Sequence, residues 1–384
     1  MIYKTFQSLK LSALGMGAMR LPVVNGVFTD IDVPAVEEMV AYAIEHGVNY
    51  FDTAYGYHDG RSEVVMGNAL RAYPRDSFYL ADKFPGYDLA NIPKVEEIFE
   101  EQLKRCGVEY FDFYLFHNVC EMNIGAYLDP QYGIYDYLLR QKANGRIRHL
   151  GFSVHGSYDV MQRFLDAYGE SMEFGQVQLN YIDWHFQNAE AKVKRLGDLG
   201  IPVWVMEPLR GGKLAALPAE QAKHLHELRP QETVPGWAFR FLQTIPNATV
   251  TLSGMSNFQQ LRENIHTFET EEPLNAAEMQ TLFELAAAMT SQTALPCTAC
   301  RYCTDGCPKH IAIPDLFALM NAKQLHRDWN ANYYYSNVHT APGRRASDCI
   351  KCGKCEGSCP QNLPIRKLLA DVAAEFEKAD GNDD

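Results

Sequence analysis

Apolar residues in the first part of the chain alternate between helical spacing and short continuous runs. Three times a helix-like stretch ends at a glycine and an apolar run follows at once, at Gly47, Gly107 and Gly200. Glycine after a helix is the expected C-terminal cap, because it adopts a left-handed conformation without strain. Asp32 and Pro34 mark a plausible start for the first of these helices. The pattern therefore predicts repeated helix–strand units.

Eight apolar runs predict eight strands. They are "ALGMG" (13–17), "NYFDTA" after Gly47, "FYLADKF" (78–84), "YFDFYLFH" after Gly107, "RHLGFSV" (148–154), "FGQVQLN" (174–180), "IPVWVM" after Gly200 and "ATVTLSG" (248–254). Eight such units suit an α/β fold of the (β/α)8 TIM barrel type, which typically takes ~250 residues. A doubly wound open sheet is the alternative. Its candidate phosphate loop, "GMGAMR", is weak because it lacks an acidic partner.

Composition narrows the class of protein. The chain has 384 residues, 47% hydrophobic and 22% charged, which is ordinary for a globular protein. A net charge of −13 argues against nucleic acid as a partner. No apolar run reaches the length of a membrane span, and the N-terminus does not resemble a signal peptide. We therefore expect a cytoplasmic protein.

Two cysteine runs near the C-terminus share the spacing C-x2-C-x2-C-x3-C-P. This spacing binds [4Fe–4S] clusters in bacterial ferredoxins, where the fourth cysteine serves the other cluster. Zinc is the alternative, but a cysteine triplet crowds a single tetrahedral ion. The spacing predicts one cluster at Cys297, Cys300, Cys303 and Cys359, and another at Cys349, Cys352, Cys355 and Cys307.

The C-terminal part of the chain, from about residue 273 on, has its own organisation. After each cysteine run a proline, Pro314 or Pro364, precedes a stretch with helical periodicity. Asn275 and Glu278 have the spacing of a capping box at the start of another helix. The predicted parts are a barrel (1–272), a bridging helix (273–293), a mainly α-helical two-cluster ferredoxin-like domain (294–370) and an acidic tail (371–384).

Several motifs carry a family resemblance. The segments "FDTAYGYHDGRSE", "LADKF", "FYLFH", "GRIRHLGFS", "EPLRGG" and "QQLREN" resemble those of the aldo-keto reductases, across residues 8–266. The C-terminal extension resembles the ferredoxin-bearing branch of that superfamily.

The resemblance implies a catalytic tetrad of Asp52, Tyr57, Lys83 and His117. Tyr57 would donate a proton to a carbonyl oxygen as hydride reaches the carbon. Lys83, paired with Asp52, would lower the pKa of Tyr57. His117 would orient the carbonyl and donate a hydrogen bond to the developing oxyanion. In this sequence Tyr57 is followed by His58 instead of the glycine of the family pattern.

The resemblance also implies a nicotinamide site. Its residues would be Ser153, Gln178, Met206, Pro208, Leu209, Arg210, Gly254, Ser256, Gln260, Glu263 and Asn264. Val154 stands where the family commonly has asparagine, and Met206 where it commonly has a stacking aromatic residue. Gly254 and Gln260 stand where NADPH-using relatives often carry cations. The cofactor therefore stays open between NADH, NADPH and a flavin.

These features predict an oxidoreductase for carbonyl reduction or alcohol oxidation, with Tyr57 as general acid/base and two [4Fe–4S] clusters for one-electron transfer. Its partners would be a small-molecule carbonyl or alcohol and a redox protein. The alternatives are an ordinary carbonyl reductase with structural clusters, and a flavin-linked or non-enzymatic electron-transfer protein. A nicotinamide moves two electrons at once and a cluster usually one, so a direct path between them needs an intermediate carrier.

Overall fold

The computed structural model forms two compact units. It describes residues 1–291, 295, 297, 302–305, 307–326, 328, 330–357, 359 and 363–377. The first unit comprises Met1–Val119 and Asn123–Ala286, and the second Cys120–Met122 and Ala287–Asp384. Among the described residues, no helix is long and apolar enough to cross a membrane.

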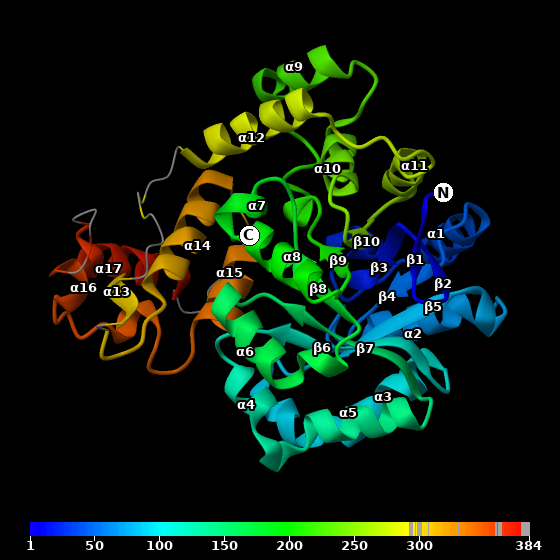
Figure 1. Ribbon diagram of the computed structural model, residues 1–384, viewed down its shortest axis with the longest axis horizontal. Coiled ribbons are helices and arrows are strands. Elements are labelled where there is room, and N and C mark those ends of the chain that lie inside the picture. The colour runs from blue at the N-terminus through cyan, green and yellow to red at the C-terminus, as the bar shows by residue number, and fades with distance from the viewer. Residues whose placement is uncertain are drawn as a thin grey trace. The chain divides into compact units, whose positions relative to one another are not determined.

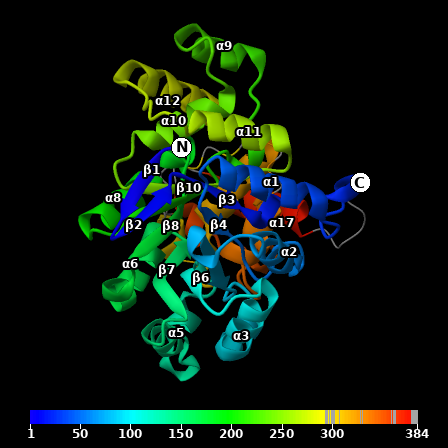
Figure 2. The ribbon, with the colours of Figure 1, turned by 90° about the vertical axis from the view of Figure 1, so that its right-hand side faces the viewer.

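The first unit is built on a closed barrel of eight parallel strands (Figures 1 and 2). In order around the barrel they are β3 (Leu14–Gly17), β4 (Tyr50–Asp52), β5 (Tyr79–Phe84), β6 (Phe111–Val119), β7 (Ile147–Val154), β8 (Phe174–Gln178), β9 (Val203–Met206) and β10 (Ala248–Gly254). Strand β10 pairs in parallel with β3 and so closes the ring. The barrel prediction is confirmed, and the open sheet is wrong.

Helices surround these strands (Figure 2). They are α1 (Val33–Glu45), α2 (Arg61–Leu70), α3 (Val95–Cys106), α5 (Ile134–Ala143), α6 (Tyr158–Tyr168), α8 (Ala189–Asp198), α10 (Val234–Gln243) and α11 (Phe258–Thr267), with the shorter α4 (Ile124–Leu128) and α7 (Asp183–Phe186) and the outlying α9 (Ala219–Leu228). The predicted stop signals are confirmed, since Gly47, Gly107 and Gly200 have φ of 88°, 66° and 69°. The Asp32 carboxylate caps α1 by accepting from the Ala35 amide at 3.2 Å.

A hairpin that the sequence pattern did not predict packs at the N-terminal end of the barrel. It consists of β1 (Tyr3–Phe6) and β2 (Leu9–Ser12), paired antiparallel. The Phe6 ring lies 5.6 Å from the Phe113 ring and 5.2 Å from the Trp204 ring. The hairpin therefore covers the end of the barrel opposite the carboxyl ends of its strands.

Helices α2 and α3 approach so closely that only glycine fits between them at Gly67. A Cβ at this position would lie 2.2 Å from the Cys106 carbonyl oxygen. Because a backbone atom cannot give way as a side chain can, Gly67→Ala should lower the free energy of unfolding by about 3 kcal/mol, the upper end for overpacking. Urea denaturation measures this.

The matched control is Gly125→Ala in α4. A Cβ there meets nothing within 4 Å, so the change should be neutral or slightly stabilising. Equal unfolding free energies for the Gly67→Ala variant and the wild type would contradict the close-approach argument.

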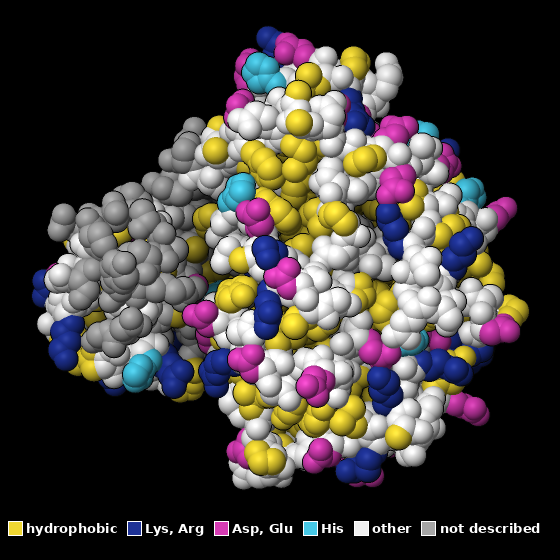
Figure 3. Space-filling view, viewed as in Figure 1, with side chains coloured by type: hydrophobic (Ala, Val, Ile, Leu, Met, Phe, Trp, Pro, Cys, Tyr) yellow, Lys and Arg dark blue, Asp and Glu magenta, His cyan; other side chains and the backbone are white. Residues whose placement is uncertain are grey.

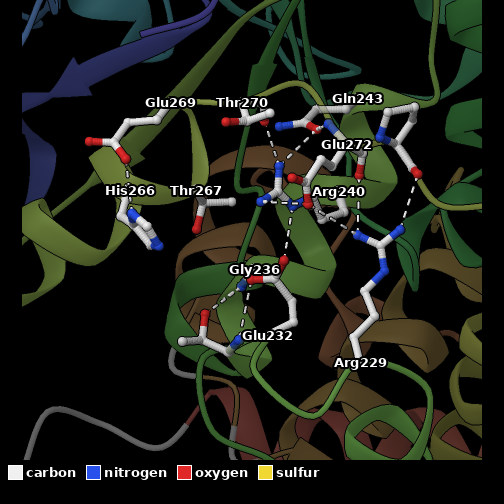
Figure 4. A network of polar contacts seen from close by, with 12 residues as sticks. Arg229, Glu232, Gly236, Arg240, Gln243, His266, Thr267, Glu269, Thr270 and Glu272 are labelled. Atoms are coloured by element: carbon white, nitrogen blue, oxygen red, sulfur yellow. Dashed lines mark hydrogen bonds and ion pairs between the residues drawn. The ribbon is translucent and has the colours of Figure 1, made fainter.

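Helix α12 (Ala276–Ser291) begins in the first unit and is anchored there by charge. The predicted capping box is confirmed: the Asn275 amide donates to Glu278 at 2.8 Å, and the Glu278 amide to Asn275 Oδ1 at 3.0 Å. Glu278 also accepts from Arg229 at 2.7 and 2.8 Å. Nearby, Arg240 donates to Glu232 at 2.9 Å and to the Thr270 carbonyl at 2.6 Å (Figure 4).

The second unit is mainly helical. Its described helices are α13 (Tyr302–Asp305), α14 (Ile313–His326), α15 (Asn330–Tyr334), α16 (Lys354–Gly357) and α17 (Ile365–Phe376). Pro314 lies in the first turn of α14, and Pro364 is the N-cap of α17. Buried residues from these helices form one core, which also contains Cys120.

The surface carries charges of both signs. On the face shown in Figure 3, acidic and basic side chains are interspersed over the helices of the first unit. This distribution is that of an ordinary solvated protein surface.

Candidate active site and cluster site

The polar residues implied as a tetrad lie at the carboxyl ends of neighbouring strands. Asp52 ends β4, Lys83 lies in β5 and His117 in β6, while Tyr57 follows in the loop after β4. Lys83 Nζ donates to Asp52 Oδ1 at 2.6 Å and to the Thr53 carbonyl at 2.7 Å. Lys83 is 0% and Asp52 3% exposed. This is an ion pair sealed from water.

Tyr57 and His117 stand beside that ion pair. Lys83 Nζ is 5.0 Å from the centre of the Tyr57 ring. The Tyr57 and His117 rings are 6.1 Å apart and nearly perpendicular, at 80°. The fold therefore brings all four side chains, from three consecutive strands, into one group.

The surroundings raise the pKa of Tyr57 well above its ordinary value. Removal of water from the phenol is the main cause, followed by the negative charges of Asp52, Glu207 and Asp82, while Arg20 acts in the opposite direction. These effects outweigh the expected lowering by Lys83, so the net shift of the Tyr57 pKa is upward. Asp52 pairs with Lys83 and cancels part of the Lys83 field at the phenol.

His117 is neutral in this site. Burial lowers the pKa of its imidazole well below the ordinary value, and the positive charges of Lys83 and His155 lower it further. Its Nδ1 atom is buried and has no hydrogen-bond partner among the described residues. A neutral imidazole with an unpaired nitrogen suits hydrogen bonding to an incoming polar ligand.

Other buried atoms at this end of the barrel also lack partners. Within the described chain these include Asp52 Oδ2 and Gln176 Oε1. Gln178, the glutamine implied by the resemblance, is instead engaged: its amide donates to Asp183 at 2.8 Å. Ser153 Oγ accepts from the Asn118 amide at 2.8 Å. These unpaired polar atoms suit a polar ligand. Of the two glutamines, Gln176 is the one whose side-chain oxygen has no hydrogen-bond partner among the described residues.

Gln176 is a second candidate beside Gln178, because β8 carries two glutamines on the same face. Residues two apart in a strand share a face, so Gln176 and Gln178 fit the pattern equally well. Met206, on the neighbouring β9, lies beside Gln176, with the amide 3.5 Å from its sulfur.

Arg20 supplies a cation that sequence reasoning also missed. Gly254 and Gln260 lack the charge often found there in NADPH-using relatives, yet a Cβ on Gly254 would lie 3.1 Å from Arg20 Cβ. The Arg20 guanidinium pairs with Glu207 at 3.3 Å. The turn after β3 therefore packs the stem of a cationic side chain against the end of β10, where the sequence of β10 itself has no cation.

The "PLRGG" segment is held by a buried carboxylate. Arg210 Nε lies 3.3 Å from Asp183 Oδ1, and both side chains are almost fully buried. Pro208 is buried and Leu209 half-buried in the same turn. Because Asp183 compensates its charge, Arg210 anchors this turn to α7.

Helix α11 carries the residues implied for the adenosine end. Its N-terminus is ordered by two contacts: the Gln260 amide donates to Asn257 at 2.9 Å, and the Ser256 amide to Gln260 at 2.8 Å. Asn264 is buried and donates to Ser253 at 3.0 Å, while Glu263 accepts from Gln259 at 2.8 Å. Gly254, Ser256 and Gln260 are therefore the exposed members of this set.

The second unit gathers cysteines from both runs around one cavity. Its lining includes Cys307 from the first run together with Cys349, Cys352 and Cys355 from the second. The described cysteines are free thiols. Four thiols from the two runs suit a cubane cluster, in which each thiolate binds a different iron. Cys297, Cys303 and Cys359 belong to or pack against the same core, while Cys300 lies outside the described residues.

Comparisons with known proteins agree with this division. The model of the "Aldo/keto reductase family" matches residues 13–287, and that of a "4Fe-4S dicluster domain" matches residues 296–364. The chain is 26% identical over 325 residues to an NADH-specific methylglyoxal reductase of Escherichia coli (strain K12), covering 73% of this chain and 96% of that one. It is 25% identical over 321 residues to a probable aldo-keto reductase 1 of Glycine max, covering 72% and 86%.

Solved structures show the same barrel. An aldo-keto reductase from Bacillus halodurans in its holo form superposes with a TM-score of 0.60 at 23% identity, covering 74% of this chain and 95% of that one. One from Klebsiella pneumoniae in complex with NADPH gives 0.59 at 20% identity, covering 74% and 96%.

Proposed function

The chain belongs to the aldo/keto reductase family, and from that premise we propose that it reduces a small carbonyl compound with a nicotinamide cofactor, using Tyr57 as the proton donor. The observation that carries this is the grouping of Tyr57 and His117 around the sealed Lys83–Asp52 pair. The unpaired atoms His117 Nδ1 and Gln176 Oε1 support a polar ligand at the same place.

Each residue has a distinct part in the proposal. The nicotinamide supplies hydride when bound. Tyr57, protonated because of its high pKa, donates its phenolic proton to the carbonyl oxygen. Neutral His117 donates a hydrogen bond to that oxygen and, being uncharged, does not compete with Tyr57 as the proton donor. Lys83 faces the Tyr57 ring and offsets the phenolate that forms.

The cofactor would lie along the exposed residues at the carboxyl ends of the strands. We assign Ser153 and Gln176 as hydrogen-bond partners of the nicotinamide carboxamide, and Gln178 as the alternative glutamine for this role. Met206 would pack on the face of the nicotinamide ring. The diphosphate of the cofactor would lie along the turn formed by Pro208, Leu209 and Arg210. Gly254, Ser256, Gln260, Glu263 and Asn264 would flank the adenosine, with Arg20 as the nearby cation. One relative is named NADH-specific and one solved neighbour holds NADPH, so both cofactors belong in the assay.

An anaerobic screen tests the function. Purified holoprotein is mixed with NADH or NADPH and a panel of carbonyls that includes 2-oxoaldehydes, the class named in one relative. We expect consumption of reduced cofactor with equimolar alcohol formed. Turnover that requires a bound flavin, or none with any carbonyl, would contradict the proposal.

The pH dependence should differ between the two directions. Because the pKa of Tyr57 is raised, the phenol stays protonated through neutral pH. The kcat/KM for carbonyl reduction should therefore be flat between pH 6 and 9, while alcohol oxidation, which needs the tyrosinate, should accelerate as pH rises. Initial rates in a constant-ionic-strength buffer series measure this. A reduction rate that falls through pH 7 would contradict it.

We assign the second unit as a two-cluster electron-transfer domain. In this assignment residues 294–370 form the domain, 273–293 the bridging helix and 371–384 the tail. Cys307, Cys349, Cys352 and Cys355 would hold one cluster, as their shared cavity supports. Cys297, Cys300, Cys303 and Cys359 would hold the other. A one-electron redox protein in the cytoplasm would be the partner of these clusters.

The interleaved ligands give a quantitative prediction. Cys307 comes from the first cysteine run but lines the cavity with three cysteines of the second run. Cys307→Ser should therefore remove one whole cluster, and the iron content should fall from about eight to about four atoms per chain. Iron analysis and electron paramagnetic resonance of the reduced protein measure the loss. Cys106→Ser, at a buried cysteine of the barrel, is the control and should keep all the iron. Unchanged iron in the Cys307→Ser variant would contradict the pairing.

A further inference from the structure

His58, which departs from the family pattern, is enclosed by a loop from another part of the barrel. It directly follows Tyr57 and is 1% exposed. Its Nδ1 lies 2.5 Å from the Phe28 carbonyl oxygen, and its Nε2 lies 3.2 Å from the Leu21 amide. The ring also stacks on the Phe28 ring, with centroids 4.4 Å apart at 15°.

Both ring contacts fix one chemical form of His58. The Leu21 amide is a donor, so Nε2 must accept, and the Phe28 carbonyl is an acceptor, so Nδ1 must carry the proton. Burial has the largest effect on the pKa of His58 and lowers it, which favours this neutral form, while the backbone contacts with Phe28 and Met19 act in the opposite direction. A single imidazole therefore joins the tyrosine loop to two points of the segment that follows β3.

Ser62 holds the same segment from its other side. Ser62 Oγ donates to the Ala18 carbonyl at 3.1 Å, and His58 accepts from Leu21 three residues later. Between these two anchors lies Arg20. The turn Ala18–Leu21 is thus fastened at both ends to residues that come just after Tyr57 in the chain.

Arg20 connects this turn to the rest of the site. Its guanidinium pairs with Glu207 at 3.3 Å, and its carbonyl accepts from Ser256 Oγ at 3.0 Å. Of the charges acting on Tyr57, Glu207 raises the pKa of the phenol and Arg20 lowers it. A displacement of Arg20 would therefore change the pKa of Tyr57, the proposed proton donor.

We propose that His58 is a positioning residue that, through its two ring hydrogen bonds, holds the Ala18–Leu21 turn and with it the Arg20–Glu207 ion pair in place beside Tyr57. The inference rests on the proposed function insofar as Tyr57 is the proton donor. Loss of the ring bonds would free the turn, move Arg20 and disfavour the tyrosinate.

The test compares His58→Phe, which keeps the stacking and removes both hydrogen bonds, with Arg20→Leu and with the double variant. We expect His58→Phe and Arg20→Leu each to lower kcat for alcohol oxidation roughly tenfold, at saturating cofactor, with little change in KM for the alcohol. Because both act on one element, the double variant should be no slower than the slower single variant. His58→Gln, whose amide can donate and accept, should recover part of the rate.

Hydrogen exchange supplies a readout that needs no turnover. In His58→Phe, amides in residues 18–31 should exchange faster than in the wild type. The matched control is His46→Phe, because His46 also contacts a carbonyl, that of Tyr42 at 2.8 Å, and stacks on an aromatic ring, 3.8 Å away. It should leave both the exchange of 18–31 and the kinetics unchanged.

The outcomes separate the inference from the function. The positioning role would be overturned if the rate loss of the double variant equalled the product of the two single losses. It would also be overturned if amides in residues 18–31 exchanged at the wild-type rate in His58→Phe. An inactive wild type would defeat the proposed function, while the exchange comparison would still decide whether His58 holds the turn.

Discussion

Replacing Tyr57 with phenylalanine should lower kcat/KM for carbonyl reduction by roughly 10²- to 10⁴-fold, the range for loss of a positioned proton donor. The change removes one oxygen and keeps the ring that faces Lys83 at 5.0 Å, so the fold should be preserved. KM should change little, because the proton is needed at the transition state more than in substrate binding. Steady-state kinetics with the best carbonyl from the screen measure the loss.

The chain offers a matched control two residues away. The Tyr55 hydroxyl donates to Glu101 at 2.9 Å, and its ring faces Arg105 at 4.4 Å. Tyr55→Phe removes the same oxygen from the same loop and should keep the wild-type rate. A Tyr57→Phe variant with more than a tenth of the wild-type rate would show that another group donates the proton.

The barrel was predictable because its signals are local. Apolar runs, helical periodicity and the capping glycines Gly47, Gly107 and Gly200 each act within one turn or strand. The β1–β2 hairpin lacked such support, since its burial depends on Phe6 meeting Phe113 and Trp204. The metal-type spacing of the two cysteine runs is equally local, and the cavity that contains Cys307 and Cys349 agrees with it.

The electrostatics of the site was less predictable. Sequence places Lys83, paired with Asp52, near Tyr57. It does not show how completely the phenol is buried, and burial is the main reason that the pKa of Tyr57 is raised. The Arg20 side chain packs against Gly254 from a turn more than 200 residues away in the chain, and no spacing rule reveals that approach. The choice between Gln176 and Gln178 depends on which amide Asp183 engages.

Lys83→Met should be the most damaging single change in the barrel. It removes one partner of a fully buried ion pair and leaves the Asp52 carboxylate without its cation, so the free energy of unfolding should fall by about 3–5 kcal/mol at pH 7. Activity should also be lost, because no charge then offsets the phenolate of Tyr57. Chemical denaturation and kinetics measure the two effects separately.

The stability loss should depend on pH in a defined direction. Burial raises the pKa of Asp52, while the charge and hydrogen bond of Lys83 lower it. Without Lys83 this pKa rises further above its unfolded value. Protonated Asp52 is tolerated in the variant at low pH, and stability is lost as pH rises through the folded pKa. The difference between variant and wild type should therefore be smaller at pH 5 than at pH 8.

The double variant Asp52→Asn/Lys83→Met separates stability from catalysis. It removes both charges, so most of the lost free energy of unfolding should return and its dependence on pH should flatten. Activity should stay low, because the cation that faces Tyr57 is still missing. A double variant as unstable as Lys83→Met alone would show that Lys83 stabilises the barrel through its bond to the Thr53 carbonyl, and that the ion pair contributes little. Recovered activity would show that Tyr57 works without a cation, and would exclude Lys83 from the mechanism.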